Sequence, residues 1–162
     1  MLPEINDILF ATDLSKNSDN ALRYALSTAR AYGAGVHVLH VTEPLSQDAI
    51  VTLQMFLQDD ESRKKAIGDR HASVKEMLRK NQQDFVQLLP ESEKQDYSVV
   101  KSVELVDGHS AEMILQRASE LNCQLIVMGT HEQGTGHTFI GTVVKRVLRR
   151  SSIPTLIIPN TA

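Results

Sequence analysis

The chain has 162 residues, of which 41% are hydrophobic and 23% charged, a composition typical of a soluble globular protein. A net charge of −3, an aromatic content of 4% and the absence of tryptophan argue against a basic, base-stacking surface for nucleic acid. No apolar stretch approaches the roughly 18 residues of a membrane span, and the first residues do not resemble a signal peptide. We therefore expect one cytoplasmic domain over residues 1–162 that binds neither nucleic acid nor a membrane.

The single cysteine, Cys123, lies in an apolar-flanked stretch between Leu121 and Leu125. One cysteine cannot form a disulfide within the chain, which fits a reducing compartment. We expect a buried structural thiol rather than a reactive nucleophile. The six histidines are scattered without the spacing of a zinc site, so no structural metal is expected.

The first part of the chain predicts a strand, a helix and a second strand. An almost continuous apolar run at 8–11 is typical of a strand covered on both faces. Polar residues at 12–15 suit a strand-end loop and a helix N-cap, and apolar residues at helical spacing follow over 18–32. Gly33 can end that helix, and the β-branched run 36–41 predicts a strand parallel to the first.

The long middle section, residues 46–90, carries apolar residues at helical spacing and ends at Pro90. The acidic run that begins at Asp59 can open a second helix, so the pattern leaves one bent helix or two open. We expect its methionine and phenylalanine residues, including Phe56 and Met77, to pack in the core.

The last part of the chain continues the alternation of strands and helices. Strands are predicted at 97–106, 125–128 and 155–158, and helices at 111–121 and 142–150. This order predicts a parallel α/β sheet with helices on both faces. Ligands of such sheets lie outside the carboxyl ends of the strands, which here means the ends of the first, second and fourth strands.

The loop after the fourth strand, residues 128–142, is rich in glycine and leads into a helix at Gly141-Thr142. The first amides of a helix lack intrahelical partners and lie at its positive end, so the loop predicts an anion site, most naturally for phosphate. The Thr142 hydroxyl can donate to a phosphate or cap the helix. The loop is neither a Walker A motif nor a dinucleotide fingerprint, since it contains no Gly-Lys-Ser/Thr and no G-x-G-x-x-G.

Several stretches in order resemble the universal stress protein family over essentially the whole chain. They are residues 8–15 with an Asp-x-Ser turn, 39–41, 107–114, 125–131, 143–148 and 153–158. The resemblance implies an open five-stranded parallel sheet of the Rossmann-like, adenine nucleotide alpha hydrolase-like type, with strand order 3-2-1-4-5. It also implies a homodimer that pairs through the C-terminal edge strand.

The resemblance further implies an adenine-nucleotide site. The expected ligand is ATP, bound together with Mg²⁺. Asp13 and the Val41 backbone would face the adenine and ribose, Met128 the ribose side and Ala11 the adenine pocket. Gly129 and the amides from Gly141 would face the phosphates. The complete expected set is Ala11, Thr12, Asp13, Val41, Met128, Gly129, Thr130, His131, Gly141, Thr142 and Val143.

The phosphate loop departs from the pattern of nucleotide-binding members of the family. Glu132 stands where the second glycine belongs, and the 11 residues between Gly129 and Gly141 are one fewer than the pattern has. A carboxylate 4 Å from a phosphate charge opposes binding by roughly 4 kcal/mol at an effective dielectric of 20. Through Mg²⁺ the same carboxylate can help to hold the phosphates, and facing solvent it does neither. Gly134 and Gly136 can re-route the loop.

Three functions follow from these observations. The first is a regulatory ATP-binding protein of the stress response, with at most slow hydrolysis because no general base is evident. The second is a dimeric interaction protein that binds no nucleotide, as in family members without the glycine pattern. The third, an adenylating enzyme related to ATP pyrophosphatases, is disfavoured because Thr12-Asp13-Leu14-Ser15 lacks the glycines of their first loop.

Overall fold

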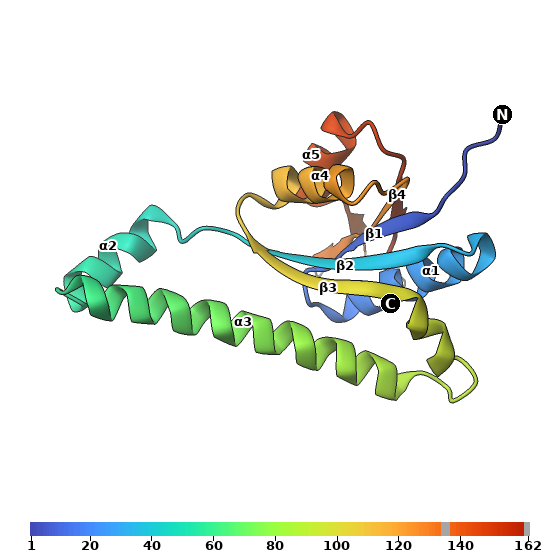
Figure 1. Ribbon diagram of the computed structural model, residues 1–162. Coiled ribbons are helices and arrows are strands. Elements are labelled where there is room, and N and C mark those ends of the chain that lie inside the picture. Colours follow the sequence, from blue (N-terminus) through green and yellow to red (C-terminus); the bar gives the residue numbers. More distant parts are fainter. Residues whose placement is uncertain (134–136, 161–162) are drawn as a thin grey trace.

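The computed structural model describes residues 1–133 and 137–160, with residues 131–133 and 137–139 described by their backbone (Figure 1). Its main sheet is parallel and has the order β3-β2-β1-β4-β7. The strands are β1 (Asp7–Ala11), β2 (Gly35–Thr42), β3 (Val100–Asp107), β4 (Leu125–Gly129) and β7 (Thr155–Ile158). The predicted order 3-2-1-4-5 is confirmed, with β7 as the fifth strand.

Helices cover both faces of this sheet (Figure 1). They are α1 (Lys16–Tyr32), α2 (Gln47–Phe56), α3 (Asp60–Leu88), α4 (Ser110–Glu120) and α5 (Thr142–Arg150). Side chains alternate along each strand, so Ile8 and Phe10 pack toward α1 and α3, whereas Leu9 packs toward α4 and α5. The central strand β1 is therefore buried on both faces, as its continuous apolar sequence predicts.

Helix α1 begins and ends where its sequence places cap residues. The Ser15 side chain accepts a hydrogen bond from the Ser18 N–H at the first turn. Gly33 has a φ of 67°, a left-handed conformation that glycine adopts without steric cost, and it ends the helix. These caps fix the start of α1 next to the carboxyl end of β1, where the candidate site lies.

The middle section forms two helices, and the prediction that its methionine and phenylalanine residues pack in the core is wrong for most of them. Helix α2 contains no buried residue, and the Phe56 side chain is 80% exposed. Helix α3 buries only Leu78, Gln82 and Phe85, while Met77 is exposed. The physical reason is position: α2 and the first half of α3 extend past the sheet (Figure 1), where no other described part of the chain covers them.

The third strand begins later than predicted, because residues Lys94–Val99 form a 3₁₀ helix rather than a strand. Tyr97 packs against Phe85 of α3 with 6.3 Å between the ring centroids. Its hydroxyl donates to Gln82 Oε1 at 3.0 Å, which satisfies a buried amide oxygen. This contact joins the inner half of α3 to the body of the protein.

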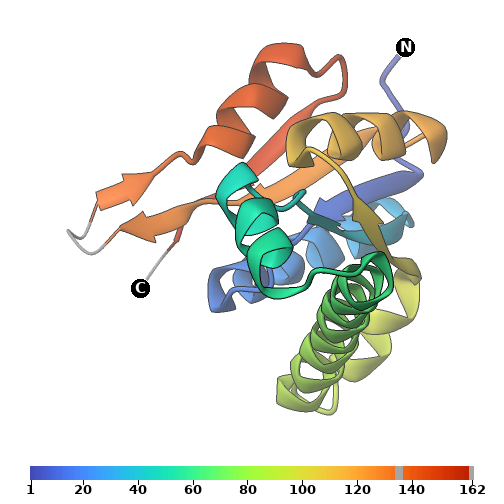
Figure 2. The same cartoon turned by 90° about the vertical axis from the view of Figure 1, so that its left-hand side faces the viewer.

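The loop after β4 contains a two-stranded antiparallel ribbon that was not predicted from the sequence. It consists of β5 (His131–Gln133) and β6 (His137–Phe139), and it lies between β4 and α5 (Figure 2). Three-residue strands are too short to show a periodicity. Gly134 and Gly136, and the side chains of Glu132, His131 and His137, lie outside the described residues.

Strand β7 is an edge strand, as predicted, with Leu156 exposed. Cys123 is buried, and burial raises the pKa of its thiol to about 11, which agrees with a structural role. Among the described residues, no helix combines the length and the apolar character that crossing a membrane requires.

A polar cluster ties β1, β2 and β3 together at the amino end of the sheet. Asp7 Oδ1 lies 2.9 Å from His37 Nε2 and 2.8 Å from Lys101 Nζ, and His37 Nδ1 lies 2.7 Å from Ser102 Oγ. Partial burial acts to raise the pKa of Asp7, but the hydrogen bonds and charges of Lys101 and His37 outweigh it. The net result is a pKa of Asp7 below its ordinary value.

We expect this cluster to make stability depend on acid pH. Because the pKa of Asp7 is lower in the folded chain, its contribution is present above the unfolded pKa of about 3.9 and is lost as the pH falls through the folded value. Urea unfolding of Asp7→Asn between pH 2 and 7 should show less destabilisation at low pH than at neutral pH. An equal loss at every pH would contradict this assignment.

Candidate functional site

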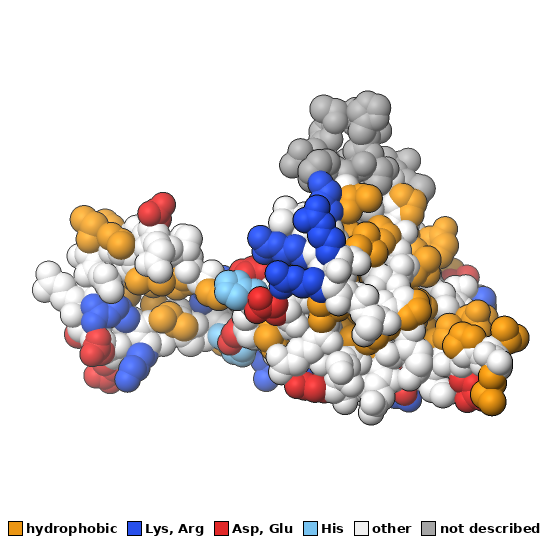
Figure 3. Space-filling model, turned by 90° about the horizontal axis from the view of Figure 1, so that it is seen from above, with side chains coloured by type: hydrophobic (Ala, Val, Ile, Leu, Met, Phe, Trp, Pro, Cys, Tyr) orange, Lys and Arg blue, Asp and Glu red, His pale blue; other side chains and the backbone are white. Residues whose placement is uncertain are grey.

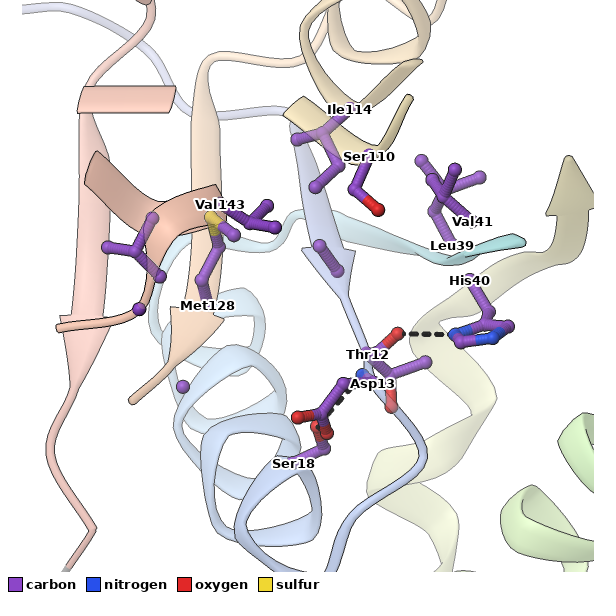
Figure 4. A pocket seen from close by; sticks show the side chains of 14 residues that line it. Thr12, Asp13, Ser18, Leu39, His40, Val41, Ser110, Ile114, Met128 and Val143 are labelled. Carbon is purple, nitrogen blue, oxygen red and sulfur yellow. Dashed lines mark hydrogen bonds between the residues drawn. The ribbon is translucent and has the colours of Figure 1, made fainter. Parts of the chain in front are cut away.

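A cavity of about 110 Å³ opens at the carboxyl ends of β1, β2 and β4 (Figure 4). One water molecule needs only about 10–15 Å³ of such a cavity, so a group larger than water can enter. Its walls also include the starts of α4 and α5, at the position where the strand order reverses and α/β sheets bind ligands. The lining residues are Ala11, Thr12, Asp13, Ser18, Leu39, His40, Val41, Ser110, Ile114, Met128, Gly129, Gly141, Val143 and Val144.

Most residues of the set expected from the sequence line this one cavity. These are Ala11, Thr12, Asp13, Val41, Met128, Gly129, Gly141 and Val143. Thr130 is buried outside it, where its N–H donates to Ile158 O and its hydroxyl accepts from Asn160 N. Thr142 is the exposed first residue of α5. His131 belongs to β5, and its side chain is not described.

The loop between β1 and α1 holds the Asp13 carboxylate in a network of hydroxyl groups. Asp13 Oδ1 accepts from the Ser15 N–H at 2.9 Å, the Ser15 hydroxyl at 2.5 Å and the Ser18 hydroxyl at 2.6 Å. Ser18 Oγ in turn lies 3.2 Å from the Asp13 N–H that donates to it. Ser18 is buried in the first turn of α1, so the helix fixes the orientation of the carboxylate.

Leu14, in the same loop, has a φ of 65°, which is rare for a residue with a branched side chain. Its N–H donates to Thr12 Oγ1 at 3.0 Å, and the bonds to Asp13 on one side and the helix cap on the other maintain the conformation. Such backbone strain persists only where the surrounding contacts impose it, and it concentrates at functional sites. The loop is therefore preorganised around Asp13.

The rest of the cavity is mainly apolar, with walls from both sides of the β1 end. Leu39 and Val41 come from β2, Met128 from β4 and Ile114 from α4 (Figure 4). Leu39 and Met128 are almost fully buried, so they present a rigid surface. A flat apolar group with polar substituents at one edge fits such a wall, because Asp13 and backbone groups lie at its rim.

Six further residues line the cavity without having been predicted: Ser18, Leu39, His40, Ser110, Ile114 and Val144. Leu39 and His40 adjoin Val41 at the predicted strand end, and proximity to that end was a signal that could have included them. Ser18 and Ser110 lie in first helical turns that follow strands, a second signal. Ile114 and Val144 have the sequence pattern of buried helix positions. Nothing in the sequence shows whether such a residue lines the cavity or packs in the core.

The amino ends of helices α4 and α5 differ in whether a protein side chain already accepts hydrogen bonds from their first amides. At α4 the Ser110 N–H donates to Glu43 Oε1 at 2.8 Å. Hydrogen bonds from the Ser110 side chain and backbone lower the pKa of Glu43. A carboxylate therefore already neutralises the positive end of α4. At α5 the N-cap is Gly141, which is buried and lines the cavity, and none of the side chains that the structure describes caps the helix. The start of α5 is thus the better position for a ligand anion.

The surface next to this region carries a positive patch. Lys and Arg side chains gather on the face seen from above (Figure 3), and the exposed residues of α5 include Lys145, Arg146, Arg149 and Arg150. Arg150 lies 3.7 Å from Glu112 of α4. The last two arginines lie in the final turn of α5, where cations are stabilised by the helix dipole.

Among the residues whose side chains the structure describes, 1–130 and 140–160, no group of three or more His, Cys, Asp or Glu residues is placed to hold a metal ion.

The protein is an open, parallel α/β protein with a cavity where its strand order reverses, the position at which ligands of such sheets bind. The profile of the Universal stress protein family matches residues 4–159. The chain therefore belongs to the universal stress protein family.

Solved structures show the same fold. A universal stress protein family member from Burkholderia pseudomallei is 24% identical, with a TM-score of 0.61, covering 96% of this chain and 97% of that chain. A universal stress protein from Archaeoglobus fulgidus in complex with dAMP is 18% identical, with a TM-score of 0.59 and coverages of 94% and 97%. A universal stress protein in complex with cAMP is also 18% identical, with a TM-score of 0.59 and coverages of 96% and 98%. No curated protein matches in sequence.

Proposed function

We propose that the chain is a regulatory ATP-binding protein of the stress response, acting in the cytoplasm. The observation that carries the proposal is the continuity of one cavity: its apolar walls lead to Asp13 on one side and to the uncapped start of α5 on the other. An adenine nucleotide has the matching order of flat base, hydroxylated sugar and anion. The complexes of two structural relatives with cAMP and dAMP support an adenine nucleotide as the ligand class.

In this proposal the base lies against Ala11, Val41 and Met128, and Asp13 accepts from the ribose. The phosphates lie against Gly129 and the first amides of α5, at Gly141, Thr142 and Val143. A Cβ at Gly129 would meet Ala21 Cβ of α1 at 3.5 Å, an ordinary contact, so packing against α1 does not by itself require glycine at this position. Mg²⁺ enters with the phosphates, whose oxygens are the ligands that this hard cation prefers.

Thermal unfolding with ATP, ATP-Mg²⁺ and AMP tests the proposal. A ligand that binds only the folded state stabilises it by RT ln(1 + [L]/Kd), about 2.7 kcal/mol at a concentration of 100 Kd. We expect the midpoint to rise by several degrees with ATP-Mg²⁺ and by less with AMP, which lacks two phosphates. No rise at millimolar ATP, with or without Mg²⁺, would contradict the proposal.

A second candidate, a dimeric interaction protein that binds no nucleotide, is favoured by one observation. Glu132 replaces a glycine of the family pattern, and the segment from Gly129 to Gly141 is one residue shorter than in that pattern. The same thermal titration separates the two functions. For either function we propose that the protein is a homodimer. The two copies pair through the edge strand β7, where Leu156 is exposed. Light scattering at several concentrations tests this assembly.

A further inference from the structure

The ladder between β1 and β2 ends in an unusual way at the cavity. The last paired residues are Ala11 and Leu39, and the Thr12 N–H still donates to Leu39 O at 2.9 Å. In a parallel ladder the carbonyl of the same residue then accepts from the N–H two residues further along the partner strand. Here that donor would be the Val41 N–H.

A side chain takes this position instead. His40 Nδ1 lies 2.7 Å from Thr12 O, as the dashed line in Figure 4 marks. A carbonyl oxygen only accepts, so Nδ1 carries the hydrogen and the ring is the donor. Among the described residues, no backbone hydrogen bond joins the Val41 N–H to Thr12 O. The His40 ring has replaced the last rung of the ladder.

The replacement leaves the Val41 peptide facing the cavity. Peptide groups alternate along β2, and those of Thr42 face β3, since the Gly108 N–H donates to Thr42 O at 3.0 Å. The groups of Val41 therefore face the opposite neighbour, β1, which has already ended at Ala11. Val41 also lines the cavity. Its N–H is a backbone donor at the rim of an apolar wall.

We propose that His40 is a positioning residue for recognition of the base, an inference that rests on the proposed function. By satisfying Thr12 O, the ring keeps the Val41 N–H available for an acceptor, such as a ring nitrogen of adenine. Without the ring, Thr12 O would be left without its donor, and the Val41 N–H would close onto it because unpaired backbone carbonyls are costly. His40 also holds the peptide that precedes Asp13, so one side chain sets both polar groups of the site.

The test compares His40→Ala with His40→Asn, whose amide can donate from nearly the position of Nδ1, and with His71→Ala on α3 as a control. Amide hydrogen exchange is measured on the ligand-free protein. We expect the Val41 amide to exchange about tenfold more slowly in His40→Ala, as it gains a hydrogen bond, and at the original rate in the other two variants. A Val41 amide that is equally protected in the original chain and in His40→Ala would overturn the inference.

ATP titrations of the same variants add a second measurement. We expect the affinity to fall about tenfold in His40→Ala and to return in His40→Asn. If the original chain binds ATP and His40→Ala binds it equally well, the role of His40 is overturned while the proposed function stands. If the original chain binds no ATP, the proposed function fails, and the role of His40 in recognition fails with it. The exchange rates in the ligand-free protein still decide the ladder claim by themselves.

Discussion

Replacing Phe10 with alanine is expected to lower the free energy of unfolding by about 3–5 kcal/mol. Phe10 lies in the central strand β1 and is 1% exposed in the core between the sheet and α1. Truncation removes the transfer free energy of the ring and leaves a cavity that a close-packed sheet cannot fill. Urea unfolding followed by circular dichroism measures the loss.

Phe56 provides the matched control for this measurement. The same substitution there removes a ring that is 80% exposed at the end of α2. We expect Phe56→Ala to change the free energy of unfolding by no more than about 0.5 kcal/mol. Similar losses at the two positions would mean that α2 is covered by other parts of the protein in solution.

Replacing Asp13 with alanine is expected to lower the affinity for ATP at least tenfold. The substitution removes the acceptor of the Ser15 and Ser18 hydroxyls together with the proposed acceptor for the ribose. Hydrogen bonds to a charged group contribute about 1.5–3 kcal/mol each, and the lower end of that range is already a factor of ten. The folded state should also lose about 1–3 kcal/mol, because the buried Ser18 hydroxyl loses its acceptor.

Asp48→Ala is the control for Asp13, since it removes an exposed carboxylate from the first turn of α2, away from the cavity. Calorimetric titration with ATP measures all three proteins. We expect Asp48→Ala to bind as the original chain does. Equal affinities for Asp13→Ala and the original chain would show that the carboxylate makes no contact with the ligand.

The sheet could be predicted from the sequence because its strands carry strong local signals. The run 8–11 is continuously apolar as a doubly covered strand must be, and Gly33 marks the end of α1. The strand order, in contrast, came from the family resemblance, since no local pattern states which strands are neighbours. The late start of β3 was missed because Tyr97 looks like a strand residue, although its contacts with Phe85 and Gln82 hold it in a 3₁₀ turn.

The middle section shows what periodicity cannot decide. Apolar residues at helical spacing predicted helices correctly, but they did not reveal whether another layer covers them. Phe56 and Phe85 have the same chemistry and the same helical setting, yet only Phe85 faces α1 and the 3₁₀ helix. Whether these residues are buried depends on how the chain turns between Leu57 and Asp59. The sequence indicates that α3 starts there, but it does not indicate in which direction the α3 axis points.

Some features of the candidate site could likewise be predicted from local sequence patterns, and others could not. Asp13, Gly129 and Gly141 stand at strand ends and helix starts, which sequence patterns locate well, and all three line the cavity. The role of His40 depends on a ring reaching across from one strand to the carbonyl of another, at 2.7 Å. A contact of that kind between residues 28 positions apart is set by tertiary register, so no local pattern contains it.

The most direct test of the account is a titration of the ¹⁵N-labelled protein with ATP-Mg²⁺, followed by amide chemical shifts. Binding in the cavity predicts the largest shifts at Asp13, Val41, Gly129 and the first turn of α5, with small shifts in α2 and the outer half of α3. An unchanged spectrum at millimolar ATP, or shifts confined to the exposed basic residues of α5, would contradict the assignment of this cavity as a nucleotide site.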